Sequence, residues 1–417
     1  MQLPKYSIGV GDRFAHQGLA QLEAVILAGR EGVEISPVWN KSNREHTIVG
    51  SRPADVRAEA DAAVQARRWT RPYFVDADHI GLKTVDGFLE ASDFFTLDVA
   101  DLIGVEAPTD VLERFVTRHE NLVGRMSLPG LDRPLEVTRA TIGEMAKKFL
   151  AAIGEAGRIF RRIDGVKGGQ SPVIEVSMDE TDRPQTPLEL FIILAAVADE
   201  GIPAQTIAPR FVGRFNKGVD YVGDVAEFRR QFEEDLAVVA LATEKFQLPK
   251  NLKLSVHSGS DKFAIYGPMH EALKKFNAGV HLKTAGTTWL EELIGLAMVG
   301  GEGLAIAKDV YRGAYGRFEE LCAPYASVVA IDRGKLPSPE VVAQWSGDAF
   351  AAALRHDTAC DAYDPNFRQL LHVGYKVAAE MGDRFIAALR QHSTVIAENV
   401  TRNLYERHIR PLFLGTP

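Results

Sequence analysis

Short apolar segments alternate with helix-forming segments through most of the chain. Eight segments have the length and composition of buried strands, and a helical stretch separates each from the next. The predicted strands cover 5–10, 33–39, 72–77, 94–99, 173–176, 204–208, 252–256 and 280–282. Eight strand-plus-helix units predict a closed parallel (β/α)8 TIM barrel, an α/β fold. An open doubly wound sheet is the alternative.

Two long segments fall outside this alternation. Residues 101–138 are polar and have no strong period, which favours an inserted loop or small subdomain. After residue 305 the chain is amphipathic at helical spacing, as in Phe367, Leu370 and Leu371. A barrel needs about 250 residues, so a chain of 417 residues has room for both segments. We therefore predict a catalytic barrel over 1–304, with its insertion, and a helical extension over 305–417 packed on the barrel.

The composition excludes several classes of partner. The formal net charge is −8 and no basic stripe is present, which argues against nucleic acid. No apolar run approaches the length of a membrane span. The N-terminus lacks the basic and apolar regions of a signal peptide. Two cysteines, Cys322 and Cys360, make no disulfide framework. We expect a cytoplasmic protein that binds a small molecule, with oligomerisation left open.

Imidazole and carboxylate groups follow three of the predicted strands. The third strand runs into Asp78 and His79, the seventh is followed by His257, and the eighth contains His281. In a barrel, residues at the carboxyl ends of the strands meet at one mouth. Three nitrogen ligands with an open position are typical of a catalytic divalent metal site. We predict that His79, His257 and His281 bind a divalent ion such as Zn, Mn or Ni.

Further polar residues occupy the same predicted level. Arg13 and Lys283 follow the first and eighth strands and are expected to contact a polar substrate. Glu175, on the fifth strand, either faces the mouth as a fourth ligand or second base, or faces the helix layer. Ser258 begins a small loop whose backbone N–H groups can hold a polar oxygen. His372 shares a helix face with Arg368, and this face either reaches the mouth or is solvated.

A nicotinamide enzyme is the rival interpretation of the N-terminal segment. Gly9 and Gly11 follow a strand and precede a helix, as in a dinucleotide-binding turn. The third glycine of that pattern is replaced by Phe14, which would prevent close packing of helix on strand. Asp12 and Arg13 also place charge where the pyrophosphate would approach. The incomplete pattern argues against a nicotinamide cofactor.

Five segments together resemble a known family. They are 7–14 (SIGVGDRF), 73–79 (YFVDADH), 215–224 (FNKGVDYVGD), 257–262 (HSGSDK) and 367–376 (FRQLLHVGYK). These segments look like the tagaturonate epimerase family, and the resemblance spans almost the whole chain. It implies interconversion of D-tagaturonate and D-fructuronate with a divalent metal. The Asp78-His79 pair and the loop after His257 are also similar to class II aldolases. Those enzymes usually have glycine in place of Ser258. The serine in this chain departs from their loop and suits a substrate without phosphate.

The implied reaction restricts the mechanism. The two ketouronates differ at C4, whose C–H is adjacent to neither the ketone nor the carboxylate, so its deprotonation gives no stabilised anion. Either C4 is oxidised transiently by a nicotinamide, or the C3–C4 bond is broken by retro-aldol cleavage and remade. The second route needs a Lewis acid at the ketone and a base at the C4 hydroxyl. The sequence offers candidates for both, so we predict the retro-aldol route.

The predicted roles follow from this route. Asp78 is the expected base, and Arg13, Lys217 and Lys283 are expected to hold the carboxylate or hydroxyls. Two other classes remain open. A metal-dependent aldolase or sugar isomerase would use the same mouth, whereas a non-catalytic sugar-acid binding protein would not need three convergent histidines.

Overall fold

The eight long strands of the computed structural model form one closed barrel. The structure describes residues 1–284 and 286–416. Around the barrel the strands follow the order β1-β10-β9-β8-β7-β4-β3-β2, and each neighbouring pair is parallel. The predicted barrel is therefore confirmed and the open sheet is excluded.

Nearly every residue of these strands is buried, as expected where helices cover the outside of the sheet and side chains fill its interior. The strands are β1 (Tyr6–Gly11), β2 (Ser36–Ser42), β3 (Phe74–Ile80), β4 (Phe94–Asp98), β7 (Val173–Ser177), β8 (Ala204–Ala208), β9 (Lys253–His257) and β10 (Val280–Lys283). The predicted strands match these elements closely, with their ends displaced by a few residues.

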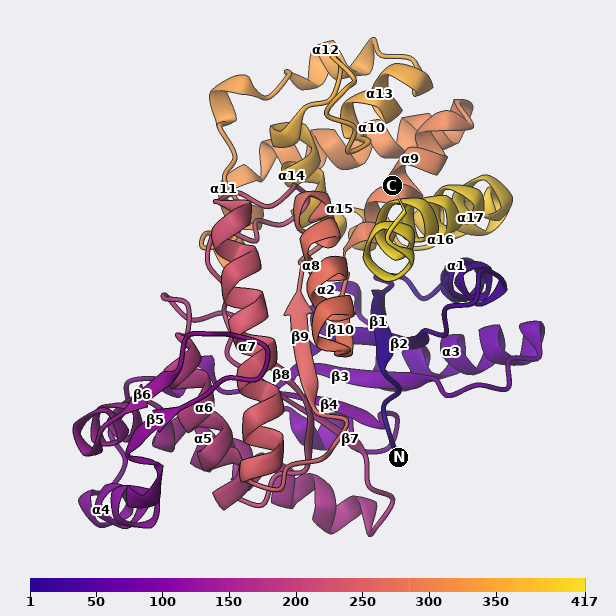
Figure 1. Ribbon diagram of the computed structural model, residues 1–417. Helices are drawn as coiled ribbons and strands as arrows, with labels where there is room; N and C mark the ends of the chain where they lie inside the picture. Colours follow the sequence, from indigo (N-terminus) through magenta and orange to yellow (C-terminus); the bar gives the residue numbers. More distant parts are fainter. Residues whose placement is uncertain (285, 417) are drawn as a thin grey trace.

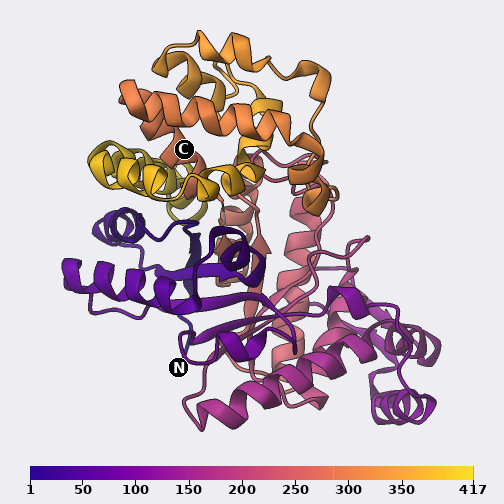
Figure 2. The same cartoon turned by 180° about the vertical axis from the view of Figure 1, so that it is seen from behind.

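Helices cover the outside of the barrel (Figures 1 and 2). They are α1 (Gly18–Arg30), α2 (Asn43–Val49), α3 (Pro53–Arg67), α5 (Arg139–Lys167), α6 (Pro187–Asp199), α7 (Val225–Lys245), α8 (Phe263–Phe276) and α9 (Thr287–Met298). One connection departs from the expected unit. Between β3 and β4 the chain has only the 3-10 turn η1 (Val85–Gly87) and no α-helix. No described helix is long and apolar enough to cross a membrane.

The segment between β4 and α5 folds as a small projection beside the barrel (Figure 1). It contains η2 (Ala100–Leu102), α4 (Thr109–Arg118), η3 (Glu120–Leu122), β5 (Gly124–Met126) and β6 (Leu135–Val137). Strands β5 and β6 form an antiparallel pair separate from the barrel. No single period runs through the sequence of this region, since it combines one ten-residue helix with turns and two three-residue strands.

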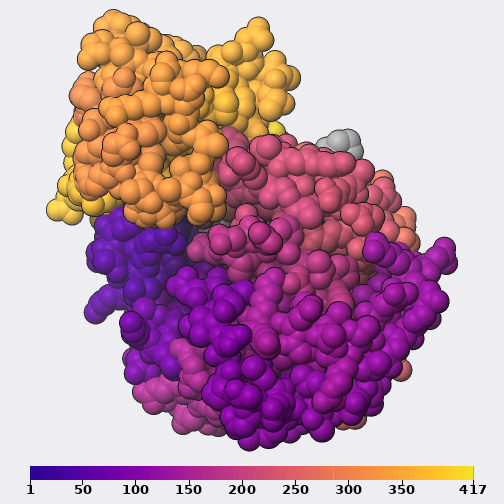
Figure 3. All heavy atoms as spheres, turned by 90° about the vertical axis from the view of Figure 1, so that its left-hand side faces the viewer, coloured from indigo at the N-terminus to yellow at the C-terminus, as the bar shows by residue number. Residues whose placement is uncertain are grey.

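The remaining residues form helices that gather at the end of the barrel toward which the β9 arrow points (Figure 1). They are α10 (Gly301–Gly316), α11 (Phe318–Cys322), η4 (Ala323–Tyr325), η5 (Arg333–Lys335), α12 (Pro339–Ala343), α13 (Gly347–Leu354), α14 (Pro365–Val373), α15 (Tyr375–Glu380), α16 (Asp383–Gln391), α17 (Ser393–Arg402) and the π-helical η6 (Asn403–Leu414). In the space-filling view they form a separate mass above the barrel (Figure 3). They pack mainly on α1, α8 and α9, so the predicted helical extension is confirmed.

The turn between β1 and α1 is held by one of its own side chains. The Asp12 carboxylate accepts hydrogen bonds from the backbone N–H groups of Phe14, Ala15 and His16, at 2.9–3.0 Å. A dinucleotide pyrophosphate would need these same donors. In the turn after β1 these donors are therefore already bound to a carboxylate of the protein itself.

Helix α6 begins with a reciprocal capping box that is expected to stabilise the fold measurably. The Thr186 hydroxyl accepts from Glu189 N, the Glu189 carboxylate accepts from Thr186 N, and Pro187 occupies the first turn. Replacing Thr186 by Ala leaves a helix donor without its partner, and we expect a loss of about 1 kcal/mol. The measurement is the free energy of unfolding in urea.

Thr47→Ala is the matched control, because Thr47 is exposed on α2 and its hydroxyl donates to the carbonyl of Asn43 within the same helix. Its unfolding free energy should change by less than about 0.5 kcal/mol. Equal effects of the two substitutions would contradict a stabilising role for the cap.

Candidate active site

A cavity of about 490 Å³ opens at the carboxyl ends of the barrel strands. Its floor is formed by residues at the ends of β3, β9 and β10 and its walls by the loops after β7 and β8. Residues 325–329 of the C-terminal extension complete one side. The cavity thus lies where the fold class places catalytic groups.

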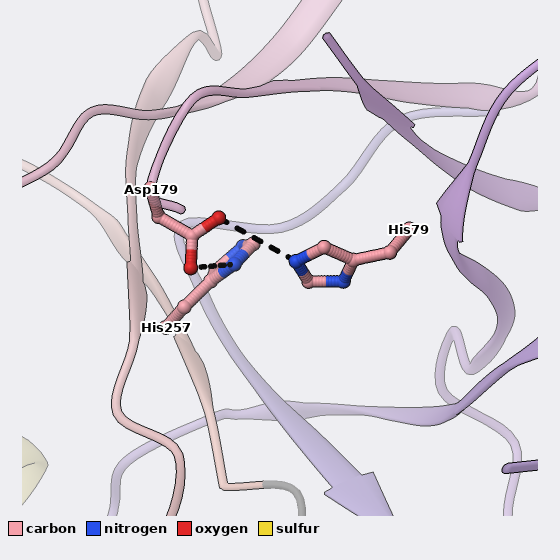
Figure 4. Close-up of side chains that lie close together, drawn as sticks. All are labelled: His79, Asp179 and His257. Carbon is pink, nitrogen blue, oxygen red and sulfur yellow. Dashed lines mark ion pairs between the residues drawn. The ribbon is translucent and has the colours of Figure 1, made fainter. Parts of the chain in front are cut away.

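Two histidines and one aspartate converge at this cavity (Figure 4). Asp179 Oδ1 lies 3.4 Å from His79 Nε2, and Asp179 Oδ2 lies 3.1 Å from His257 Nδ1. One ligand atom from each residue lies within 4.8 Å of the others. These atoms are the nitrogen and oxygen donors that divalent transition metals accept.

A local irregularity in β3 brings His79 to this position. The pairing register between β3 and β4 shifts between Ala77 and Ile80. His79 has φ of 51°, in the left-handed region that is uncommon for a residue with a side chain. Successive side chains of a regular strand point to opposite faces, so this bulge allows both Asp78 and His79 to reach the cavity.

The second nitrogen of each imidazole is held by a buried carboxylate. His79 Nδ1 lies 2.8 Å from Asp78 Oδ1, and His257 Nε2 lies 2.8 Å from Glu175 Oε1. The nitrogens that face Asp179 are buried and have no well-formed hydrogen bond among the described residues. Metal-binding histidines usually have this arrangement, in which an outer carboxylate fixes the ring orientation. The residues present therefore fit a divalent ion.

The carboxylates also favour positive charge at the two imidazoles. Burial alone would lower the pKa of His257, but the charges of Asp179 and Glu175 raise it to about 9. The pKa of His79 is raised well above its usual value in the same way, chiefly by Asp78 and Asp179. The site therefore has the electrostatics of a cation-binding centre.

Beneath the triad, Lys283 lies among three carboxylates. Its Nζ is 2.9 Å from Asp76 Oδ2, 2.8 Å from Asp78 Oδ1 and 3.0 Å from Glu175 Oε1. These charges outweigh burial and raise the pKa of Lys283 well above its usual value. Lys283 was predicted to contact substrate. It borders the cavity, but its charge is already compensated by the protein.

His281 lies apart from the other two histidines, contrary to the prediction of a three-histidine site. Its Nδ1 lies 2.9 Å from the hydroxyl oxygen of Ser7, and its ring packs on Phe94. It precedes Lys283 by two positions on β10, which places it about 6–7 Å deeper in the barrel. Burial lowers the pKa of His281 to about 3, so it stays neutral. Asp179 takes the third place.

The other predicted substrate contacts differ in their positions. Arg13 lines the cavity, pairs with Glu45 at 2.6 Å and stacks on the Tyr375 ring. Lys217 lines the cavity from the loop after β8. Ser258 is fully buried, and its hydroxyl donates to the backbone carbonyl of Lys283.

His372 is also buried, and it lies on α14 outside the residues that line the cavity. It packs against Gly218 and Gly286. The prediction that it contacts substrate therefore has no support from its position, because loop backbone stands on both sides of the ring.

Asp179 is the site residue that the sequence reasoning missed. It follows β7 by two residues, directly before Glu180, whereas Glu175 is the predicted site residue of this segment. Two adjacent acids after a buried strand were a usable signal. Arg210 and Tyr325 also line the cavity. Arg210 is one of the polar residues that follow a predicted strand, two residues after the end of β8, whereas no sequence pattern pointed to Tyr325.

Comparisons with known proteins agree with this architecture. A family model described as tagaturonate epimerase matches residues 1–412. A tagaturonate/fructuronate epimerase of Thermotoga maritima is 27% identical over 420 residues, which cover 97% of this chain and 80% of that protein.

Two crystal structures of a fructuronate-tagaturonate epimerase from Cohnella laeviribosi, with one and two bound glycerols, are each 23% identical to this chain. The first has a TM-score of 0.78 and the match covers 97% of this chain and 82% of that one. The second has a TM-score of 0.81 and the match covers 98% and 81%. At this identity the structures show a common fold. The match of the family model to almost the whole chain shows that this protein belongs to the tagaturonate epimerase family of carbohydrate isomerases.

Proposed function

We propose that this chain interconverts D-tagaturonate and D-fructuronate with a divalent metal ion held by His79, His257 and Asp179, and that C4 is inverted by retro-aldol cleavage. The observation that carries the proposal is the pair of buried imidazole nitrogens that face one carboxylate at the mouth of the barrel. Membership of the family supports the choice of substrates, and the geometry of the site supports the reaction chemistry.

Charge balance supports a divalent ion at this position. Asp76, Asp78, Glu175 and Asp179 surround one ammonium and two imidazoles. Two protonated imidazoles carry the same charge as two neutral imidazoles with one divalent cation. Binding of the ion with release of two protons would therefore leave the net charge of the cluster unchanged. The two-nitrogen, one-oxygen donor set suits Zn, Mn, Ni or a similar ion.

The ion would act as a Lewis acid on the substrate oxygens and so favour carbon–carbon cleavage beside the ketone. A base removes the proton of the C4 hydroxyl. The C3–C4 bond breaks, its electron pair passes to C3 and the ketone oxygen, and C4 becomes an aldehyde. Rotation of the aldehyde and attack of C3 on its other face restore the bond with C4 inverted. The proton then returns to the C4 oxygen.

Asp78 remains our candidate for the base. It lines the cavity beside His79, and its Oδ1 accepts from Lys283 and lies against His79 Nδ1. Its Oδ2 has only a long contact of 3.4 Å with the Asn40 amide, so this oxygen is available to the C4 hydroxyl. Although burial alone would raise the pKa of Asp78, Lys283 and His79 hold it well below its usual value. Asp78 is therefore ionised, with no proton of its own on the oxygen that would face the substrate.

Removing a ligand should remove the metal. We expect His79→Ala, His257→Ala and Asp179→Ala to lose most of the bound divalent ion after dialysis, because each variant lacks one of three protein donors. Elemental analysis of the purified proteins measures this. His392→Ala is the matched control, since His392 is at the surface end of α16. His281→Asn should also retain metal.

Exhaustive chelation should abolish activity, and a divalent ion should restore it. Full activity in protein that elemental analysis finds free of metal would refute the metal-dependent mechanism.

The base is tested by Asp78→Asn. The amide oxygen still accepts from His79 Nδ1, so bound metal should persist, while kcat falls by at least about 100-fold because an amide takes no proton from a hydroxyl. Asp361→Asn makes the same change at an exposed loop position and should leave kcat unchanged. Normal turnover by Asp78→Asn would transfer the role to Asp76 or Glu175.

The fate of the C4 hydrogen tests the route. Carbon–carbon cleavage leaves this hydrogen on C4 throughout, so substrate deuterated at C4 should give product with its full label in ordinary water. Mass spectrometry of the two epimers measures the label. Exchange of the C4 label with solvent would show that C4 is deprotonated directly and that the bond between C3 and C4 stays intact.

A further inference from the structure

The cations that line the cavity differ in whether the protein already neutralises them. Arg13 pairs with Glu45 at 2.6 Å, and Lys283 lies within 3.0 Å of three carboxylate oxygens. Lys217 has no such partner, because within residues 1–284 and 286–416 no carboxylate pairs with its Nζ. The nearby acid Glu180 is exposed and acts on Lys217 only through its field. The other cations of the lining also lack a carboxylate partner among the described residues, but Arg44 and Arg214 are exposed and Arg210 donates to the carbonyl of Asp179.

Lys217 is nevertheless held in a defined position. Its backbone N–H donates to the carbonyl of Val328 at 2.7 Å, and its ammonium lies 5.9 Å from the centre of the Tyr325 ring. Burial lowers the pKa of Lys217, and the charges of Arg13 and Arg44 lower it further. A partly buried cation in positive surroundings is stabilised by any anion that enters the cavity.

The stem of Lys217 passes over the loop that follows His257. Its Cγ lies 3.7 Å from the point where a β-carbon on Gly259 would stand. Gly259 has φ of 64°, a conformation that glycine adopts without strain. Gly259 follows the metal-binding candidate His257 by two residues, so Lys217 stands over the cavity beside the proposed metal site.

Buried polar contacts fix the loop on both sides of Lys217. Gly218 N donates to the hydroxyl of Ser260 at 2.8 Å, and its carbonyl accepts from Arg368 Nε at 2.6 Å. On the other side, the ammonium of Lys262 donates to the carbonyl of Asn216 at 2.9 Å. Arg368 is in turn held by the buried Asp261 at 2.8 Å. The position of Lys217 is therefore preorganised by the C-terminal extension.

We propose that Lys217 binds the carboxylate of the sugar acid, and that it thereby retains the carboxylate-bearing half of the substrate while the C3–C4 bond is broken. This inference rests on the proposed function for the cleavage step. The carboxylate completes the ion pair that the protein leaves open, which places the ketone end of the substrate toward His79, His257 and Asp179.

The chemistry of the cleavage makes retention necessary. Breaking the C3–C4 bond divides the ketouronate anion into a three-carbon enediolate, from C1 to C3, and 2-hydroxy-3-oxopropanoate, from C4 to C6. Only the second fragment has a carboxylate. It must turn about its own axis before the bond reforms, so it needs an anchor away from the reacting carbon. If it escapes, protonation of the enediolate at C3 gives dihydroxyacetone, and the two products together contain all atoms of the substrate.

Binding measurements test the anchor without requiring turnover. Titration calorimetry with tagaturonate and with the neutral sugar tagatose compares wild type, Lys217→Met and Lys217→Arg, each with metal and after chelation. We expect Lys217→Met to bind tagaturonate about 10- to 100-fold more weakly, the usual effect of losing a charged hydrogen bond. Its affinity for tagatose should be unchanged, and Lys217→Arg should recover part of the loss.

Lys250→Met is the matched control, with the same change of charge at an exposed position before β9, at the other end of the barrel. It should bind both sugars as wild type does. Equal affinity of Lys217→Met and wild type for tagaturonate would overturn the inference, as would parallel losses for both sugars.

Product analysis tests retention. During turnover of tagaturonate, Lys217→Met should release more dihydroxyacetone per epimer formed than wild type or Lys250→Met. An unchanged ratio, with binding of the acid weakened, would overturn retention. If wild type discriminates the acid through Lys217 but forms no fructuronate, the anchor is supported and the proposed function is wrong.

Discussion

A single buried ammonium makes the candidate site possible. Lys283 lies among Asp76, Asp78 and Glu175, which come from β3 and β7, on the opposite side of the barrel order from β10. Without it, three carboxylates would face one another at the bottom of the cavity. Removing one partner from a buried charged cluster costs about 3–5 kcal/mol. Burial raises the pKa of Asp76 to about 6, but the charge of Lys283 holds the pKa of Asp78 and of Glu175 well below the usual range. Asp78 and Glu175 are therefore ionised and orient His79 and His257.

The bulge in β3 is the second feature on which the candidate site depends. A regular strand would direct Asp78 and His79 to opposite faces, with one of them in the helix layer. The register shift between Ala77 and Ile80 and the left-handed backbone of His79 bring both to the cavity. Such a conformation carries a conformational cost, and it persists where surrounding contacts fix it. Here Asp78 Oδ1 lies 2.8 Å from His79 Nδ1 and fixes the orientation of the ring.

The sequence predicts the barrel well because eight buried strands and their helices produce a regular alternation. It also predicts that Asp78, His79, His257 and Lys283 reach the mouth, where they line the cavity, because each lies at the end of an apolar run. It fails for His281 for a geometric reason. Lys283 pairs with His257 across the sheet, whereas His281 pairs with Ser255, one layer lower. The register between strands decides which residue of β10 reaches the mouth. A predicted strand end that is uncertain by two residues does not give this register. Asp179 depends on the path of a loop, which leaves no periodic signal.

The C-terminal helices have a structural role at the cavity, because they fix one of the barrel loops that surround it. Asp261 follows His257 in the loop after β9, and its buried carboxylate accepts from Arg368 on α14 and faces His356 and His408. Three separate parts of the extension thus meet on one barrel loop. A loop that is already fixed by several buried polar contacts loses little further conformational freedom when a ligand binds. The strands supply the donors at the floor of the cavity, and the extension fixes the loops that form its walls. The proposed chemistry is therefore divided between two parts of the structure. The reacting groups stand on the rigid barrel, while the groups proposed to select and retain the acid stand on loops that helices hold in place.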